Sequence, residues 1–219
     1  EVVFHALKNG RLRMDDTFMV SENAWRKGGA GSGGSTMFAA LKSSIPLEAL
    51  IQGVIVQSAN DGCIIIAEGM AGSEENFAKL MTERAREIGL EKSVFKNATG
   101  LPAEGQVVTV RELARLALHI WREYPEYYHY YSQPNFTWNK ITQSNRNPLL
   151  SMNIGADGMK TGFTEESGYA IVGTVTREGK RVFAAMSGMA NERERAEEAR
   201  KLLEWGLRAF QRTEIFAEG

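Results

Sequence analysis

Apolar and polar positions follow two periods along this chain, one helical and one extended. Apolar residues at helical spacing predict helices over residues 1–10, 21–27, 47–57, 63–70, 73–89, 110–123 and 191–212. Runs rich in β-branched and aromatic residues predict extended segments over 12–20, 93–96, 169–176 and 181–186, and a hairpin over 136–142. Most helices precede the strands and one helix follows them, which predicts an α+β fold with a helical region packed beside a sheet.

Local signals set the ends of several elements. Ser21 and Ser73 directly precede helical periodicity and are expected to be N-caps. Thr109 and Glu112 have the spacing of a capping box at the start of another helix. Residues 177–180 form a tight turn between the last two strands, so those strands are expected to pair as an antiparallel hairpin.

Composition and charge exclude some classes of protein. The chain has 219 residues, of which 43% are hydrophobic, enough to bury one sizeable core. Its net charge of −1 argues against a nucleic-acid surface, which would carry a basic excess. The histidines His5, His119 and His129 lack metal-ligand spacing, so no metal site is expected. The single cysteine, Cys63, lies in an apolar run and is expected to be a small buried hydrophobic residue.

Three further stretches have compositions that predict a surface loop, a helix start and core packing. Residues 28–35 are rich in glycine and serine but lack the lysine of a phosphate-binding loop, so we expect a mobile surface loop that borders a cleft. Ser44 and Pro46 are then expected to open the helix over 47–57. The tyrosines around Pro125 occur without a basic patch, so they are expected to pack in the core rather than stack on bases.

Lys160-Thr161-Gly162 lies between a loop-like segment, residues 153–158, and the extended run over 169–176. At the head of a strand this triplet offers an ammonium group, a hydroxyl group and an unhindered backbone edge. These groups suit an extended anionic ligand, such as the carboxylate end of a peptide. The same triplet also occurs at ordinary strand starts, so it indicates a function only together with a second motif.

Ser58-Ala59-Asn60 is the second motif, in a break between two apolar helices. It places two small polar side chains at the start of the helix over 63–70. The structural alternative is helix capping, with Asn60 or Asp61 as the N-cap and Ser58 without a role. Taken alone, the local sequence leaves both interpretations open.

The two motifs together resemble the second and third motifs of the penicillin-recognising serine enzymes. Four stretches in order narrow the resemblance to the D-alanyl-D-alanine carboxypeptidases, the low-molecular-mass penicillin-binding proteins: residues 53–61, 97–102, the Asn-Arg-Asn segment at 145–147 with its following leucines, and 157–162. The similarity runs from about residue 1 to about residue 212. It implies one penicillin-binding/β-lactamase-like transpeptidase domain over residues 1–219, in which helices pack beside an antiparallel sheet in a sandwich-like arrangement.

The first motif of that family, Ser-x-x-Lys, is absent from its expected place just before the helix over residues 1–10. Ser93 and Lys96 have this spacing, but they follow Ser58 in the chain and lie on an extended segment. Residues three apart on a strand face opposite sides, so we treat this match as accidental. The first helix also lacks an N-cap, so it is expected to begin further upstream. We therefore expect a carboxypeptidase domain whose N-terminal part is missing or carried separately, and a chain that is inactive for want of its nucleophile.

The resemblance implies acyl transfer through a serine ester, which no metal or organic cofactor assists. The target would be the peptide bond between the two terminal D-alanines of a peptidoglycan stem peptide. The serine and lysine of the absent motif would be the nucleophile and its base. Ser58 would relay a proton to the leaving nitrogen, Asn60 would orient the substrate amide, and Lys160 would supply positive potential.

The same resemblance assigns substrate-binding residues. Thr161 would hydrogen-bond the terminal carboxylate, and Gly162 would let the substrate lie against the strand. The backbone N–H of Phe163 would form half of the oxyanion hole, with phenylalanine in place of a histidine that some relatives carry. Arg146 is a candidate for carboxylate recognition, with hydrogen bonds to loop carbonyls as its structural alternative. Arg195 is a weaker candidate for the same role.

Expected partners are stem peptides ending in D-Ala-D-Ala, β-lactam antibiotics as inhibitors, and an N-terminal fragment of the same protein, but no nucleic acid. The resemblance also predicts an extracytoplasmic location, in the periplasm or on the outer face of a bacterial cytoplasmic membrane. Two other functions stay open. A serine β-lactamase is disfavoured by the carboxypeptidase-like segments at 97–102 and 145–147. A non-catalytic peptidoglycan-binding module would explain a chain without a nucleophile.

Overall fold

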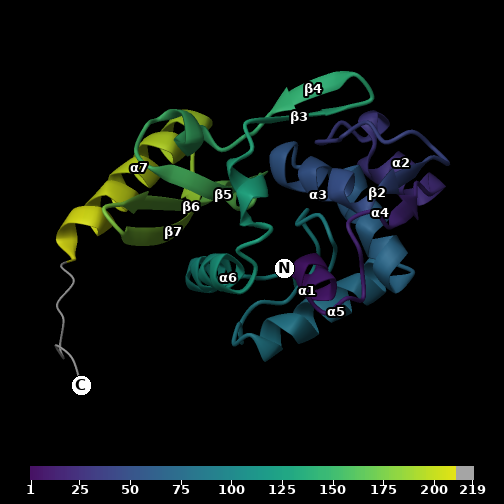
Figure 1. The fold of residues 1–219 in the computed structure, drawn as a ribbon, viewed down its shortest axis with the longest axis horizontal. Helices are drawn as coiled ribbons and strands as arrows, with labels where there is room; N and C mark the ends of the chain where they lie inside the picture. The colour runs from purple at the N-terminus through teal and green to yellow at the C-terminus, as the bar shows by residue number, and fades with distance from the viewer. Residues whose placement is uncertain (211–219) are drawn as a thin grey trace.

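The structure is a computed structural model that describes residues 1–210. The α-helices are α1 (Val2–Lys8), α2 (Glu22–Gly28), α3 (Leu47–Val56), α4 (Asn60–Ala71), α5 (Glu74–Glu87), α6 (Val110–Glu123) and α7 (Glu192–Ala209). The strands are β1 (Thr17–Met19), β2 (Ser44–Pro46), β3 (Asn135–Trp138), β4 (Ile141–Ser144), β5 (Ala156–Thr164), β6 (Gly168–Arg177) and β7 (Lys180–Met189). Short 3-10 helices are η1 (Ala30–Ser32), η2 (Tyr128–Ser132) and η3 (Pro148–Ser151). A helical region and a sheet stand side by side, which confirms the α+β prediction (Figure 1).

The principal sheet is antiparallel in the order β5-β6-β7, with helices on both faces. Phe183 of β7 contacts Trp121 of α6, with ring centroids 6.0 Å apart. Its neighbour Ala184 belongs instead to the buried cluster that contains Leu203 of α7. Adjacent strand residues point to opposite faces, so α6 and α7 cover opposite sides of the sheet. This layering is the expected sandwich.

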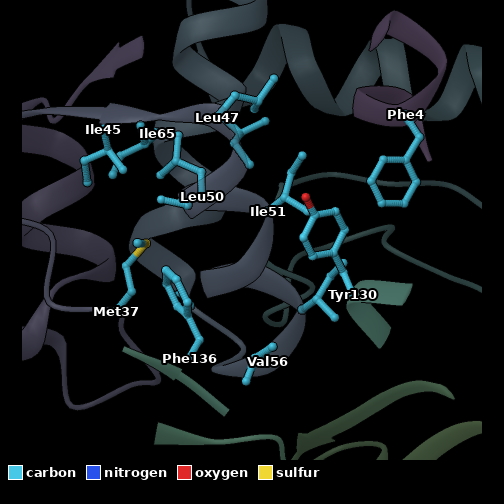
Figure 2. Close-up of a cluster of buried hydrophobic side chains, with 14 of the residues drawn as sticks. Phe4, Met37, Ile45, Leu47, Leu50, Ile51, Val56, Ile65, Tyr130 and Phe136 are labelled. Carbon is cyan, nitrogen blue, oxygen red and sulfur yellow. The ribbon is translucent and has the colours of Figure 1, made fainter. Parts of the chain in front are cut away.

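The larger hydrophobic core lies in the helical region, part of which is shown in Figure 2. Ile45 of β2, Leu47 and Leu50 of α3 and Ile65 of α4 are fully buried there. The predicted tyrosine packing is confirmed, because the buried tyrosines belong to the same cluster: Tyr124, Tyr128, Tyr130 and Tyr131. A second, smaller cluster joins the sheet to α7 and η3. The larger cluster also includes Met159 of β5, so the two clusters pack on different sides of the sheet.

Most predicted boundaries are confirmed, because local capping chemistry fixes them. Ser21, Ser73 and Thr109 each accept a hydrogen bond from a backbone N–H of the first helical turn. The capping box is only half formed, since the carboxylate of Glu112 accepts hydrogen bonds from the Lys92 N–H and the Ser93 hydroxyl instead. The predicted end of the last helix, at residue 212, lies outside the described residues.

Four boundaries were predicted wrongly. Helix α4 begins at Asn60 and not at residue 63. Residues 44–46 form β2, paired antiparallel with β1, and Pro46 only then caps α3. Residues 93–96 form no strand but a single bridge between Val94 and Val107. Strand β5 begins at Ala156, so part of the expected loop is strand and Lys160 lies well inside it. The differences at β2 and β5 come from pairing with other segments of the chain, which local periodicity cannot report.

Among the described residues, no helix combines the length and the apolar character that crossing a lipid bilayer requires.

Candidate active site

Ser58 lies in the tight connection between α3 and α4. Its backbone has a φ of +58°, an uncommon conformation for a residue other than glycine. The carbonyl of Gly53 accepts hydrogen bonds from both Gln57 and Ala59, and these bonds hold the turn. The first turn of α4 then begins at Asn60, so Ser58 and Asn60 lie at the junction between the C-terminus of α3 and the N-terminus of α4.

Strand β5 brings Lys160 to this turn from the other half of the fold. Its Nζ donates hydrogen bonds to the Oγ of Ser58 at 2.9 Å and to the Thr161 carbonyl at 2.9 Å. The two expected motifs therefore meet, although 102 residues separate them in the chain. An ammonium group carries three hydrogens, so one remains for a ligand.

The N-cap predictions for Asn60 and Asp61 were wrong. Ala59 is the N-cap of α4, and no side chain caps the helix. Asp61 is fully buried and accepts hydrogen bonds from the hydroxyl of Thr36 and from the N–H groups of Met37 and Ala39. Its carboxylate joins the segment after the glycine-rich loop to α4, because it accepts hydrogen bonds from the buried N–H groups of that segment.

The glycine-rich loop borders the cleft, as its composition predicted, through Gly34 and Ser35. The N–H of Asn60 donates to the carbonyl of Ser35 at 2.8 Å. Gly28 approaches α4 so closely that a Cβ there would lie 2.3 Å from the backbone nitrogen of Asp61. This close approach explains a glycine at that position. Its consequence is that the loop runs directly over the start of α4.

A cleft of about 890 Å³ opens between the two halves, over Ser58, Asn60 and Lys160. Thr161, Gly162 and Phe163 line one wall, on β5. Within the described part of the chain β5 pairs only with β6, so its other edge faces the cleft unpaired. An unpaired edge can hydrogen-bond an extended peptide as an added strand.

The cleft is cationic. Burial, together with the nearby charges of Arg146 and Arg195, lowers the pKa of Lys160 to about 8. Among the described residues that line the cleft, Glu192 is the only carboxylate. Such an excess of positive charge suits an anionic ligand.

Arg146 and Arg195 both line the cleft but differ in their contacts. Arg146 donates a hydrogen bond to the hydroxyl of Ser35, so its contact is with a loop side chain rather than with loop carbonyls. Arg195 is buried on the first turn of α7, and its guanidinium lies 5.5 Å from the centre of the Tyr169 ring. Within residues 1–210 its Nε has no hydrogen-bond partner.

Phe163 is 53% exposed at the mouth of the cleft, with its ring centroid 4.4 Å from that of Tyr169. Tyr169 is a residue that the sequence did not single out. Its cross-strand position opposite Phe163 follows only from the β5–β6 register. Ser35 was missed as an individual residue for a similar reason, although its glycine-rich surroundings indicated a loop at a cleft.

Two sequence expectations concern other polar residues. Cys63 was expected to be buried but is only partly so, because it lies one turn after Asn60 and lines the cleft. Desolvation of the thiol raises its pKa to about 12, so Cys63 is a neutral residue of the cleft wall. Ser93 donates its hydroxyl hydrogen to Glu112 at 2.5 Å, which agrees with a structural role and not with pairing to Lys96.

A helical region and an antiparallel sheet that meet at a serine- and lysine-lined cleft define the penicillin-binding transpeptidase class of fold. Solved structures agree with this class. The chain superposes on penicillin-binding protein 6B from Escherichia coli with a TM-score of 0.92 and 36% identity, covering all of this chain and 69% of that one. Penicillin-binding protein D2 from Listeria monocytogenes in its ampicillin-bound form gives a TM-score of 0.78 at 28% identity, over 94% of this chain and 84% of that one.

The chain belongs to the D-alanyl-D-alanine carboxypeptidase family, whose sequence pattern matches residues 1–191. It is 40% identical over 212 residues to the D-alanyl-D-alanine carboxypeptidase DacC of Escherichia coli, covering 96% of this chain and 53% of that protein. It is 30% identical to the D-alanyl-D-alanine carboxypeptidase DacF of Bacillus subtilis, over 54% of that protein. The chain thus spans about half the length of the curated relatives it matches.

Proposed function

We propose that this chain is the larger part of a serine-type D-alanyl-D-alanine carboxypeptidase that removes the terminal D-alanine from peptidoglycan stem peptides. The observation that carries the proposal is the hydrogen bond between Lys160 and Ser58 in a cationic cleft beside an unpaired strand edge. The cleft offers what such a substrate needs: a strand edge for an extended peptide, and positive charge for its terminal carboxylate.

In the proposed reaction the substrate lies along β5. Thr161 and Lys160 bind its carboxylate, and Arg146 adds positive charge from the loop side. Asn60 orients the scissile amide, and the N–H of Phe163 donates to the developing oxyanion. Ser58 passes a proton to the leaving D-alanine nitrogen, since Lys160 can supply a hydrogen to its Oγ.

The nucleophilic serine and its lysine would come from a Ser-x-x-Lys segment before Glu1 in the full-length protein, called the parent below. An apolar cavity of about 260 Å³ supports this placement. Glu1, Val2 and Val3 line it, and it shares Val54 and Cys63 with the cleft. The start of α1 therefore lies beside a cavity that adjoins the cleft.

Fluorescent penicillin distinguishes the candidate functions. We expect the parent to form a stable covalent adduct and to release D-alanine from a D-Ala-D-Ala peptide, while the 219-residue chain binds the probe without covalent labelling. Rapid turnover of the adduct without D-alanine release would identify a β-lactamase instead. A parent that is never acylated would reject the proposal in favour of a peptidoglycan-binding module. Covalent labelling of the chain alone would show that the nucleophile lies within it.

For the parent we also propose an extracytoplasmic location, because its proposed substrate is a cell-wall peptide. A solved relative in its ampicillin-bound form supports β-lactams as ligands of the parent.

A further inference from the structure

Asp157 belongs to the Asp-Gly-Met-Lys-Thr-Gly motif, yet it does not line the cleft. Its carboxylate instead accepts two hydrogen bonds from the guanidinium of Arg181 on β7, both at 2.7 Å. This two-armed geometry is the strongest form of a carboxylate–arginine pair. The Arg181 side chain is 16% exposed and that of Asp157 30%, so water screens the pair only partly.

The pair spans the whole sheet. Arg181 starts from β7, donates to the hydroxyl of the buried Thr174 on β6 at 3.1 Å, and ends on Asp157 of β5. The hydroxyl of Tyr128, from η2, also donates to Asp157 at 3.3 Å. The Asp157–Arg181 pair therefore connects β5, β6, β7 and η2 through hydrogen bonds.

Aromatic rings hold the guanidinium in place. Its carbon lies 5.0 Å from the ring centre of Trp121, 5.7 Å from that of Tyr128 and 5.9 Å from that of Phe183. These rings come from α6, η2 and β7, so they restrict the conformations that the Arg181 side chain can adopt. Cation–π contact adds to the attraction at such distances.

Asp157 is also the irregular residue of its strand. Ala156 pairs with Val175 and Gly158 with Thr174, so β5 carries one extra residue at position 157 relative to β6. Such a bulge shifts which side chains face each side of the sheet. From Gly158 onward the alternation sends Met159 into the helical core and the next residue, Lys160, to Ser58.

A slip of one residue would exchange these two faces and turn Lys160 away from the cleft. Position 158 itself favours glycine, because a Cβ there would lie 2.7 Å from the Tyr128 hydroxyl oxygen. The contacts of Asp157 therefore hold β5 in place about three residues, or about 10 Å, before Lys160.

We propose that Asp157 and Arg181 form a register clamp, a pair of positioning residues that fixes the bulge of β5 and thereby aims Lys160 at Ser58. Neither residue contacts a ligand in this assignment. The clamp acts through the strand and so determines where the cationic group of the cleft stands.

The test is an NMR titration of the Lys160 side chain in the 219-residue chain with ¹³C-labelled lysine, assigned with Lys160→Arg. In the unaltered chain its pKa is about 8, because the amine is buried beside Ser58. Asp157→Asn and Arg181→Met are each expected to raise that pKa by about one unit or more, toward the value of an exposed lysine. The double variant is expected to add little beyond the larger single effect, because both changes break the same pair.

Glu197→Gln is the matched control, because Glu197 pairs with Arg193 on the exposed side of α7. It is expected to leave the Lys160 titration unchanged. Arg181→Lys, which keeps the charge but loses the two-armed geometry, replaces Arg181→Met if that variant fails to fold. If the folded variants have a lower urea midpoint but the Lys160 pKa stays near 8, the pair only stabilises the fold. That result would overturn the proposal.

Discussion

Lys160 is the residue whose chemistry depends most on its surroundings. In sequence it is an ordinary lysine before a threonine and a glycine. In the fold it is buried, hydrogen-bonded to Ser58 and close to two arginines. Burial and these charges lower its pKa to about 8, so the ammonium form loses its proton more readily than that of an exposed lysine. The residue is thus both a charge for a carboxylate and a hydrogen donor to a hydroxyl group.

Replacing Lys160 with alanine in the parent is expected to remove an electrostatic donor that acts on the transition state. The loss should be about 3 kcal/mol or more, which corresponds to a roughly 100-fold or larger fall in the second-order acylation rate constant with penicillin. Stopped-flow measurement with a fluorescent penicillin checks this. Lys201→Ala, on the exposed face of α7, is the control, since its ammonium forms a surface ion pair with Glu198. An acylation rate equal to that of the unaltered parent would reject the role of Lys160.

The lowered pKa of Lys160 gives acylation a pH dependence of defined sign. Below about pH 8 the group is cationic, and above it the charge is lost, so capture of a carboxylate ligand should weaken as the pH rises through 8. Lys160→Arg should shift this alkaline limb upward, because a guanidinium stays charged. The pH profile of the acylation rate constant measures both. An alkaline limb that stays in place in the arginine variant would assign it to another group.

Folding stability should change in the opposite direction over the same alkaline range. The unfolded lysine keeps its proton up to its ordinary pKa of 10.5, whereas the folded one releases it near 8. The unfolded state therefore binds more protons between these values, and the free energy of unfolding contributed by this group rises with pH.

At the scale of the element, the start of α4 depends on a buried charge. Asp61 accepts hydrogen bonds from the Thr36 hydroxyl and from the N–H groups of Met37, Ala39 and Gly62, at 2.6 to 3.0 Å. It thereby joins the helix to the segment that continues the glycine-rich loop. The periodicity of a helix cannot predict the contacts with Thr36, Met37 and Ala39, because they join Asp61 to residues more than 20 positions away.

Asp61→Ala is expected to leave several buried N–H groups without partners and to destabilise the chain by about 3 kcal/mol or more. Urea denaturation followed by circular dichroism measures the change. Asp15→Ala, which removes a carboxylate from an exposed pair with Arg13, should leave the midpoint where it is. Equal effects of the two substitutions would contradict the assigned role of Asp61.

At the scale of the whole molecule, the cleft lies between two separately packed halves. One cluster surrounds α3 and α4, and the other lies between the sheet and α7. Ser58 belongs to the first half and Lys160 to the second, so the site exists only while both halves are docked. Connections such as the contact between Arg181 and Trp121 join them.

Leu203→Ala tests this division, because Leu203 is fully buried in the second cluster. The expected cost is about 2–5 kcal/mol, the range for a large-to-small change in a core. Hydrogen exchange should accelerate in β6 and β7 more than in α3 and α4, since the two cores are distinct. Trp205→Ala is the control, as that side chain is 53% exposed. Uniform acceleration across both halves would show one cooperative core.

Local sequence was enough to determine the helices, the caps and the final hairpin, because these depend on residues a few positions apart. Ser21 and Ser73 cap as expected, and the turn at Glu178 and Gly179 takes the positive φ values that a tight hairpin needs. It also determined the family, since motifs in order identify a fold without coordinates.

Only the tertiary structure decided what depends on partners far along the chain. Strand β2, the network around Asp61 and the true start of β5 all come from long-range pairing that no local window contains. The 2.9 Å contact between Ser58 and Lys160 joins residues 102 positions apart. Burial and neighbouring charge, which set the pKa of that lysine, exist only once the two halves have docked, because the solvent is then removed from between them.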